Sequence, residues 1–87
     1  MIVMAILKTK FMSMLREFID ACQAARIPEN GCYRYGTSEV FDIRNITVVV
    51  DTHVIRPKIT VSNERVSFVF NDSSMVEKSI QKIKELL

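Results

Sequence analysis

The chain of 87 residues has few of the residues from which reactive centres are built: one histidine and two cysteines. The histidine, His53, stands beside Asp51 at an expected strand connection, and nothing in the sequence brings a nucleophile to this pair. Cys22 and Cys32 have neither a C-x-x-C motif nor a histidine pair with which to complete a tetrahedral zinc site. A small hydrolase or transferase centred on the histidine is the enzymatic alternative. We expect instead no catalytic residue, no metal site and no cofactor.

The sequence also lacks phosphate-binding loops and long apolar runs. Its two glycines, Gly31 and Gly36, fit neither the P-loop spacing nor the dinucleotide-binding spacing. The opening MIVMAIL is far shorter than the roughly 20 apolar residues of a membrane span. Lys8 and Lys10 follow this segment, whereas a signal peptide has its basic residues first. We therefore expect no membrane segment and a cytoplasmic protein with reduced thiols.

Charge of one sign is not in large excess either. Lysine and arginine number 12 and aspartate and glutamate 10, which gives a net charge of +2, and the basic residues are scattered. A dedicated nucleic-acid-binding domain usually carries a larger basic excess. The hydrophobic share of 48% is typical of a folded domain, and the length predicts a single domain over residues 1–87.

The first third of the chain predicts an amphipathic helix of about five turns. It should end before Pro28, because proline disfavours helical geometry in the residue before it. Residues 1–7 fit either the start of this helix or a short strand. Met12, Ile19 and Ile27 widen its apolar side beyond one stripe. The stripe itself recurs at intervals of three and four: Leu7, Phe11, Met14, Leu15, Phe18, Cys22 and Ala25.

Residues 40–70 hold most of the β-branched residues and three of the five phenylalanines, and they alternate as half-buried strands do. One face of the predicted sheet is strongly apolar and should be covered by helices. The predicted inward residues are Phe41, Ile43, Ile46, Val48, Val50, Ile59, Val61, Val66, Phe68 and Phe70.

Short connections divide this stretch into four strands. We predict turns at Arg44-Asn45, at Thr52-His53 and, as a two-residue hairpin loop, at Asn63-Glu64. Pro57 interrupts the strand predicted over Val54–Ser62, and because proline cannot donate to a ladder it indicates an edge or a bulge there.

The chain should finish with a second helix that begins at Ser74. Ser74 and Glu77 match the capping box, in which two side chains satisfy free backbone N–H groups. The expected fold is α+β: an antiparallel meander of four strands, or five with an additional short strand, covered on one face by an N-terminal and a C-terminal helix. The apolar stripe of the second helix is Val76, Ile80, Ile83 and Leu87.

Residues 28–38 are the one stretch with the composition of a loop, since Asn30-Gly31 and Gly36 suit positive-φ turns. Loops carry binding residues more often than the elements they connect. This stretch concentrates three residues predicted to bind protein: Tyr33, Arg34 and Tyr35.

Apolar residues on the outward side of the sheet complete the predicted protein-binding surface, namely Val49 and Val69. The five methionines and the wide apolar side of the first helix also favour contact with another chain. We therefore predict a non-enzymatic interaction module, an adaptor or an inhibitor of a larger machine such as those of viruses and mobile elements, that forms a homodimer.

The alternative is a nucleic-acid-binding module. Open sheet faces with basic and aromatic side chains can hold single strands through phosphate contacts and stacking. The residues that would do so are Arg44, Arg56, Lys58 and Arg65. Thr47, Thr60 and similar small side chains stand where stacking aromatics are usually found, which weakens this alternative.

The segment RPKITVSNERVSFVFNDSSMVEKSIQKIKELL resembles, in its strand–turn–strand–loop–helix order, the second half of one repeat of the TATA-binding protein. The likeness covers about a third of the chain. It implies a curved sheet gripped by a helix, and no functional residue carries over from it.

Overall fold

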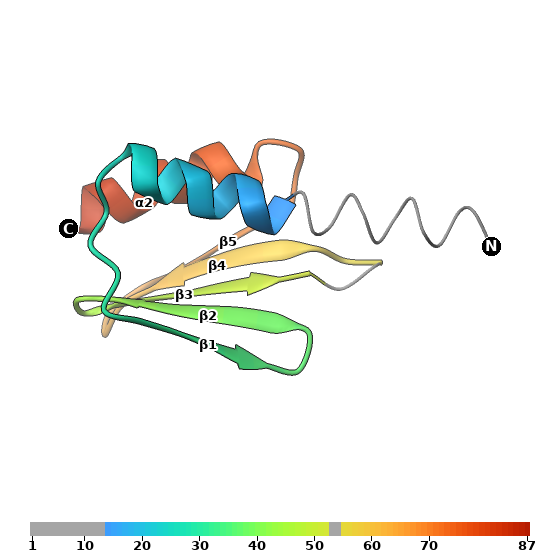
Figure 1. Cartoon of the computed structure of the whole chain (residues 1–87), viewed down its shortest axis with the longest axis horizontal. Helices are drawn as coiled ribbons and strands as arrows, with labels where there is room; N and C mark the ends of the chain where they lie inside the picture. The colour runs from blue at the N-terminus through green and yellow to red at the C-terminus, as the bar shows by residue number, and fades with distance from the viewer. Residues whose placement is uncertain (1–13, 53–54) are drawn as a thin grey trace.

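The computed structural model describes residues 14–52 and 55–87, which form an α+β fold with a helix at each end (Figure 1). A helix over residues 14–24 comes first, and the strands pair antiparallel in chain order, so the predicted meander is confirmed. The elements that follow the first helix are β1 (Gly31–Tyr35), β2 (Ser38–Ile43), β3 (Ile46–Asp51), β4 (Lys58–Ser62), β5 (Ser67–Phe70) and α2 (Met75–Leu86).

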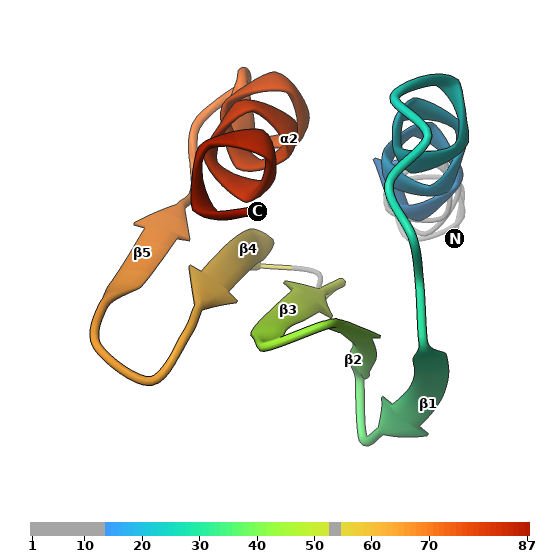
Figure 2. The same cartoon turned by 90° about the vertical axis from the view of Figure 1, so that its left-hand side faces the viewer.

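Both helices lie on the same face of the sheet, as expected. Figure 2 shows α2 on the β4–β5 side and the N-terminal helix on the β1–β2 side. The Phe18 and Phe41 rings, whose centroids are 5.3 Å apart, join the N-terminal helix to β2. The two helices therefore divide the apolar face between them.

Side-chain alternation accounts for the core. The inward residues of β2, β3 and β4 are buried with Phe18 and with the inward side of α2, while Phe68 and Phe70 are half-buried. The core residues are Phe18, Phe41, Ile43, Ile46, Val48, Val50, Ile59, Val61, Val76, Ile80 and Ile83. Ser79 is also buried, and its hydroxyl donates to the Val76 carbonyl at 2.8 Å.

The fifth strand is β1, which corrects the prediction of a loop over residues 28–38. Residues 31–35 pair with β2 through a two-residue turn at Gly36 and Thr37. Gly36 has φ +64, the conformation that glycine adopts without strain, whereas Gly31 is not at positive φ and no turn forms at Asn30-Gly31. The other predicted site for a fifth strand, residues 1–7, lies outside the described residues.

The β4–β5 connection is longer than predicted. It spans residues 63–66, not Asn63-Glu64 alone, because the Asn63 side chain accepts hydrogen bonds from the backbone N–H groups of Arg65 (2.8 Å) and Val66 (2.9 Å). Val66 consequently lies in the connection, and the prediction that it faces the core is wrong: its side chain is 42% exposed.

Pro57 does not mark a sheet edge, contrary to the prediction. β4 begins one residue later, at Lys58, and lies between β3 and β5. Because Pro57 precedes the paired residues, its missing N–H removes no ladder hydrogen bond. The connection to β4 therefore runs from residue 52 to residue 57 and is longer than the predicted Thr52-His53 turn; His53 itself lies outside the described residues.

The N-terminal helix ends before Pro28, as predicted, in a Schellman motif. The Ile27 N–H donates to the Cys22 carbonyl at 3.0 Å, and the Arg26 N–H donates to the Gln23 carbonyl at 3.1 Å. Arg26 has φ 55, so an arginine occupies the left-handed position that usually holds glycine.

The start of α2 is where the capping box predicted it, but the capping hydrogen bond is absent there. Ser74 is the N-cap and its side chain makes no cap hydrogen bond. Asp72 instead bonds the N–H that Glu77 would satisfy in a capping box: its carboxylate accepts from the Ser74 N–H at 2.9 Å and pairs with Lys78. The hydrogen bond from Lys78 holds the pKa of Asp72 below its usual value.

The surplus apolar residues of the first helix do not form a separate surface. Ile19 and Ile27 pack against the core, as do Met14 and Met75. Met12 lies outside the described residues. Within the described part of the chain, the core absorbs this apolar excess.

Truncating Phe18 tests its place at the junction of helix and sheet. We expect Phe18→Ala to lower the free energy of unfolding by about 3–5 kcal/mol, because a fully buried aromatic side chain leaves a cavity. Urea denaturation measures the change. Val69→Ala, at a largely exposed position, is the control and should cost less than about 1 kcal/mol; equal losses would contradict this core.

The left-handed arginine predicts a stabilising substitution. Arg26→Gly should raise the free energy of unfolding by about 0.5–1 kcal/mol, because glycine adopts positive φ without the side-chain clash. Arg16→Gly, inside the same helix, should instead lower it by about 1 kcal/mol. Thermal melts of both variants compare the two positions, and destabilisation by both would count against the Schellman ending.

Candidate interaction surface

The sheet face opposite the helices, which we call the outer face, is not covered by any described element (Figure 2). Because strand side chains alternate, the residues that stand between the inward residues along each strand lie on the outer face. The strand registers arrange these residues in three rows. The central row is Tyr33, Val40, Val49, Thr60 and Val69; the flanking rows are Tyr35, Ser38, Asp51 and Lys58, and Gly31, Asp42, Thr47, Ser62 and Ser67.

The central row unites three residues of the predicted protein-binding set from three different strands. Tyr33 is 53% exposed and Val69 56% exposed at the two ends of the row, and half-buried Val49 lies between them. Tyr35, 78% exposed, lies beside Tyr33 at the edge of the sheet. The outer face therefore presents a row that is apolar on four of the five strands and is interrupted on β4 by Thr60.

Val40 belongs to this row although it was not among the predicted binding residues. It pairs with Tyr33 and Val49 and is only 6% exposed, on the face away from the helices. Directly opposed residues have Cβ atoms about 5 Å apart, close enough for a tyrosine ring to shield a valine. Alternation with Phe41 was the sequence signal that would have placed it there.

The charge on the outer face is sparse. Its rows contain the carboxylates of Asp42 and Asp51 and the ammonium of Lys58, which lies directly opposite Asp51. This face therefore carries no basic excess.

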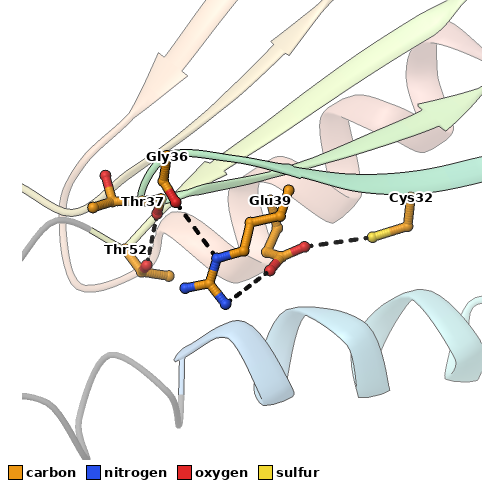
Figure 3. Close-up of polar contacts among 6 residues, drawn as sticks. Cys32, Gly36, Thr37, Glu39 and Thr52 are labelled. Carbon is orange, nitrogen blue, oxygen red and sulfur yellow. Dashed lines mark hydrogen bonds and ion pairs between the residues drawn. The ribbon is translucent and has the colours of Figure 1, made fainter.

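Arg34 points to the other side of β1 from the two tyrosines, so the predicted trio is divided. Its guanidinium lies 3.8 Å from the Glu39 carboxylate, and its Nε donates to the Gly36 carbonyl at 3.4 Å. Figure 3 shows the Cys32 thiol donating to the same glutamate, at 3.7 Å. These residues form a polar cluster on the helix side of the β1–β2 hairpin.

The tip of this hairpin is fastened to the end of β3. The Thr52 hydroxyl donates to the Thr37 carbonyl at 2.8 Å, as Figure 3 shows. The Thr52 N–H donates to the same carbonyl at 3.1 Å. The Thr37 hydroxyl in turn donates to Asp51 at 3.4 Å. These bonds hold β1, and with it Tyr33 and Tyr35, in place at the sheet edge.

The four basic residues of the nucleic-acid alternative do not share one surface. Arg44 lies in the β2–β3 turn, with φ 57, and Arg65 in the β4–β5 connection at the same end of the sheet. Arg56 and Lys58 lie at the opposite end. Five strand residues, about 17 Å, separate the two pairs.

The two thiols occupy different environments. Half-buried Cys22 lines a cavity of about 50 Å³ with Ile27 and Glu29, which has room for a few water molecules. Burial, together with Glu29, raises the pKa of the Cys22 thiol to about 11. Cys32 is exposed, and its pKa is also raised, by partial burial and by Glu39.

Two further features of residues 14–52 and 55–87 bear on other functions. No helix in these ranges has both the length and the apolar content needed to cross a membrane. No three metal-ligating side chains among these residues come together in a way that could hold an ion.

No family model, curated protein or solved structure matches the chain. The likeness to half a TATA-binding-protein repeat thus remains an observation about element order.

The thiol environments predict two rates of reaction with a chromogenic disulfide at pH 8. Exposed Cys32 should react first and Cys22 much more slowly, because a pKa of about 11 leaves about a thousandth of its thiols ionised. Raising the pH should accelerate both, and urea should merge the two phases. Cys32→Ser should remove the fast phase; its loss in Cys22→Ser instead would contradict the assignment.

Proposed function

We propose that this chain is a non-enzymatic interaction module that binds another protein through the outer face and itself forms a homodimer. The observation that carries the proposal is the central row: Tyr33, Val40, Val49 and Val69 are in register on a face that no described element covers. Apolar residues gathered on one uncovered face mark interaction sites more often than scattered apolar residues do.

The chemistry of the row specifies the kind of partner. Valines in the middle favour a flat apolar surface, and Tyr33 and Tyr35 add aromatic area with hydroxyl groups that can bond at a wet rim. Sparse charge makes the contact insensitive to salt. An adaptor, or an inhibitor that blocks a surface of a larger assembly, needs no more than this. Free Cys22 and Cys32 fit a cytoplasmic setting with reduced thiols.

The nucleic-acid alternative draws less support. Its basic residues lie at two ends of the sheet, and the face between them has more carboxylates than ammonium groups. Phosphate contacts need clustered cations along the path of the strand.

Capture from cells that produce the protein tests the proposal. Tyr33→Ala combined with Tyr35→Ala, and separately Val49→Lys, should each reduce recovery of a specific partner at least tenfold, because they remove aromatic area or insert a charge into the central row. The melting temperature should change little, since the tyrosines are largely exposed. Lys84→Ala, on the exposed side of α2, is the matched control and should leave capture intact.

Two results would count against a protein partner. A large loss of thermal stability in the tyrosine variant would mean that these side chains are structural. Retention on DNA or RNA at low salt, falling steeply as salt rises and lost with Arg44→Ala and Arg65→Ala, would favour the nucleic-acid alternative.

A further inference from the structure

The two edges of the sheet, neither of which is paired with a further described strand, differ in what they offer to another strand. The β1 edge carries Arg34, whose charged side chain on the helix side pairs with Glu39. An inward-pointing charge of this kind is one way in which proteins protect an edge from pairing. The β5 edge, Ser67–Phe70, has no charged residue of its own, although the Nζ of Lys82 in α2 lies 4.3 Å from the centroid of the Phe68 ring.

The register shows which backbone groups of β5 are free. The Asn63 N–H donates to the Val66 carbonyl at 3.0 Å, so this pair is hydrogen-bonded. Hydrogen-bonded and non-hydrogen-bonded pairs alternate along an antiparallel ladder, so Phe68 and Phe70 bond to β4. Ser67 and Val69 therefore direct their N–H and C=O groups away from the sheet.

A second copy of β5 fits these free groups. With a two-fold axis at Val69, each Val69 pairs with Val69 of the second copy, and each Ser67 pairs with Asn71 of the second copy. These pairs all use outward-directed backbone groups and give about six interchain hydrogen bonds. The outer faces of the two copies are then continuous, and so are the helix faces, where Phe68 lies beside Phe70 of the second copy.

We propose that two copies of this chain pair antiparallel through the free edges of β5, with Val69 on the two-fold axis, into one continuous ten-stranded sheet. The central row then runs unbroken from Tyr33 of one chain to Tyr33 of the other. Such a two-fold, self-complementary contact is the commonest kind of homodimer interface.

The size of the outer face explains what the dimer provides; this part rests on the proposed function. Five strands at about 4.8 Å and five residues at about 3.3 Å give a face of about 24 Å by about 17 Å, or about 400 Å². A standard protein–protein interface buries about 800 Å² on each side. Joining two outer faces edge to edge reaches that area.

Proline substitution and light scattering test the pairing. The wild-type chain at several hundred micromolar should have the mass of two chains, and Val69→Pro the mass of one. Proline removes an edge N–H that makes no bond to β4, so the far-ultraviolet circular dichroism should be retained. Val69→Thr, which keeps the branched shape and the N–H, is the control and should remain dimeric. A wild-type mass of one chain would overturn the proposal.

Cysteine crosslinking tests the axis even if the proline variant does not fold. In a Cys22→Ala and Cys32→Ser background, Val69→Cys should be joined to its second copy by a short thiol crosslinker, because opposed residues in a hydrogen-bonded pair have Cα atoms about 5.5 Å apart. Val49→Cys, from the same row but an interior strand, should stay uncrosslinked. Faster crosslinking at Val49 would show face-to-face packing and overturn the proposal.

The β5 pairing and the partner-binding outer face fail separately. If Val69→Pro abolishes the dimer and partner capture is retained, the interaction module stands. Partner binding then does not require the dimer. A crosslinked β5 dimer whose partner capture survives Val49→Lys would keep the dimer and remove the outer face as the binding surface.

Discussion

The sheet is stable only if the side chains on one of its faces are buried, and the rest of the fold depends on that burial. Val48, Val50, Ile59 and Val61 bring β-branched side chains to one face, and only an apolar cover completes their burial. Phe18 and the inward side of α2 supply it. Because both helices pack on this face, the other face is formed by the alternating strand residues, and no described helix covers it.

Periodic features of the fold could be predicted from the sequence, and local hydrogen-bond competition could not. Strict alternation revealed the three middle strands and the buried Phe41 and Ile43, since burial imposes that pattern directly. The β1 strand was hidden because Gly31 begins it and Asn30 and Gly36 flank it, which gives the stretch a loop's composition. At two other places an acidic or amide side chain, Asp72 or Asn63, bonded to nearby backbone and displaced the predicted cap and turn.

The candidate surface was predictable residue by residue but not as an arrangement. Alternation placed Val49 and Val69 outward, yet only the registers bring them into one row with Tyr33, and registers depend on turn lengths. The same parity rule, applied to residues 31–35 as a strand, separates Arg34 from its neighbouring tyrosines. The four basic residues lie close together in the sequence but at two ends of the sheet. They are separated because successive connections of a meander lie at opposite ends.

Strand order that follows chain order also bears on how the molecule is made. Each strand pairs with the one synthesised just before it, so the contacts of the sheet are local and favour rapid folding. As the chain emerges from the ribosome, the newest strand is always the free edge of the growing sheet. β5 is the last strand to become this edge. The apolar residues on the helix face of β4 and β5 are covered only after α2, which follows β5 in the chain, has been made. A nascent chain halted before residue 75 would thus carry a complete sheet with half of its apolar face still exposed to water.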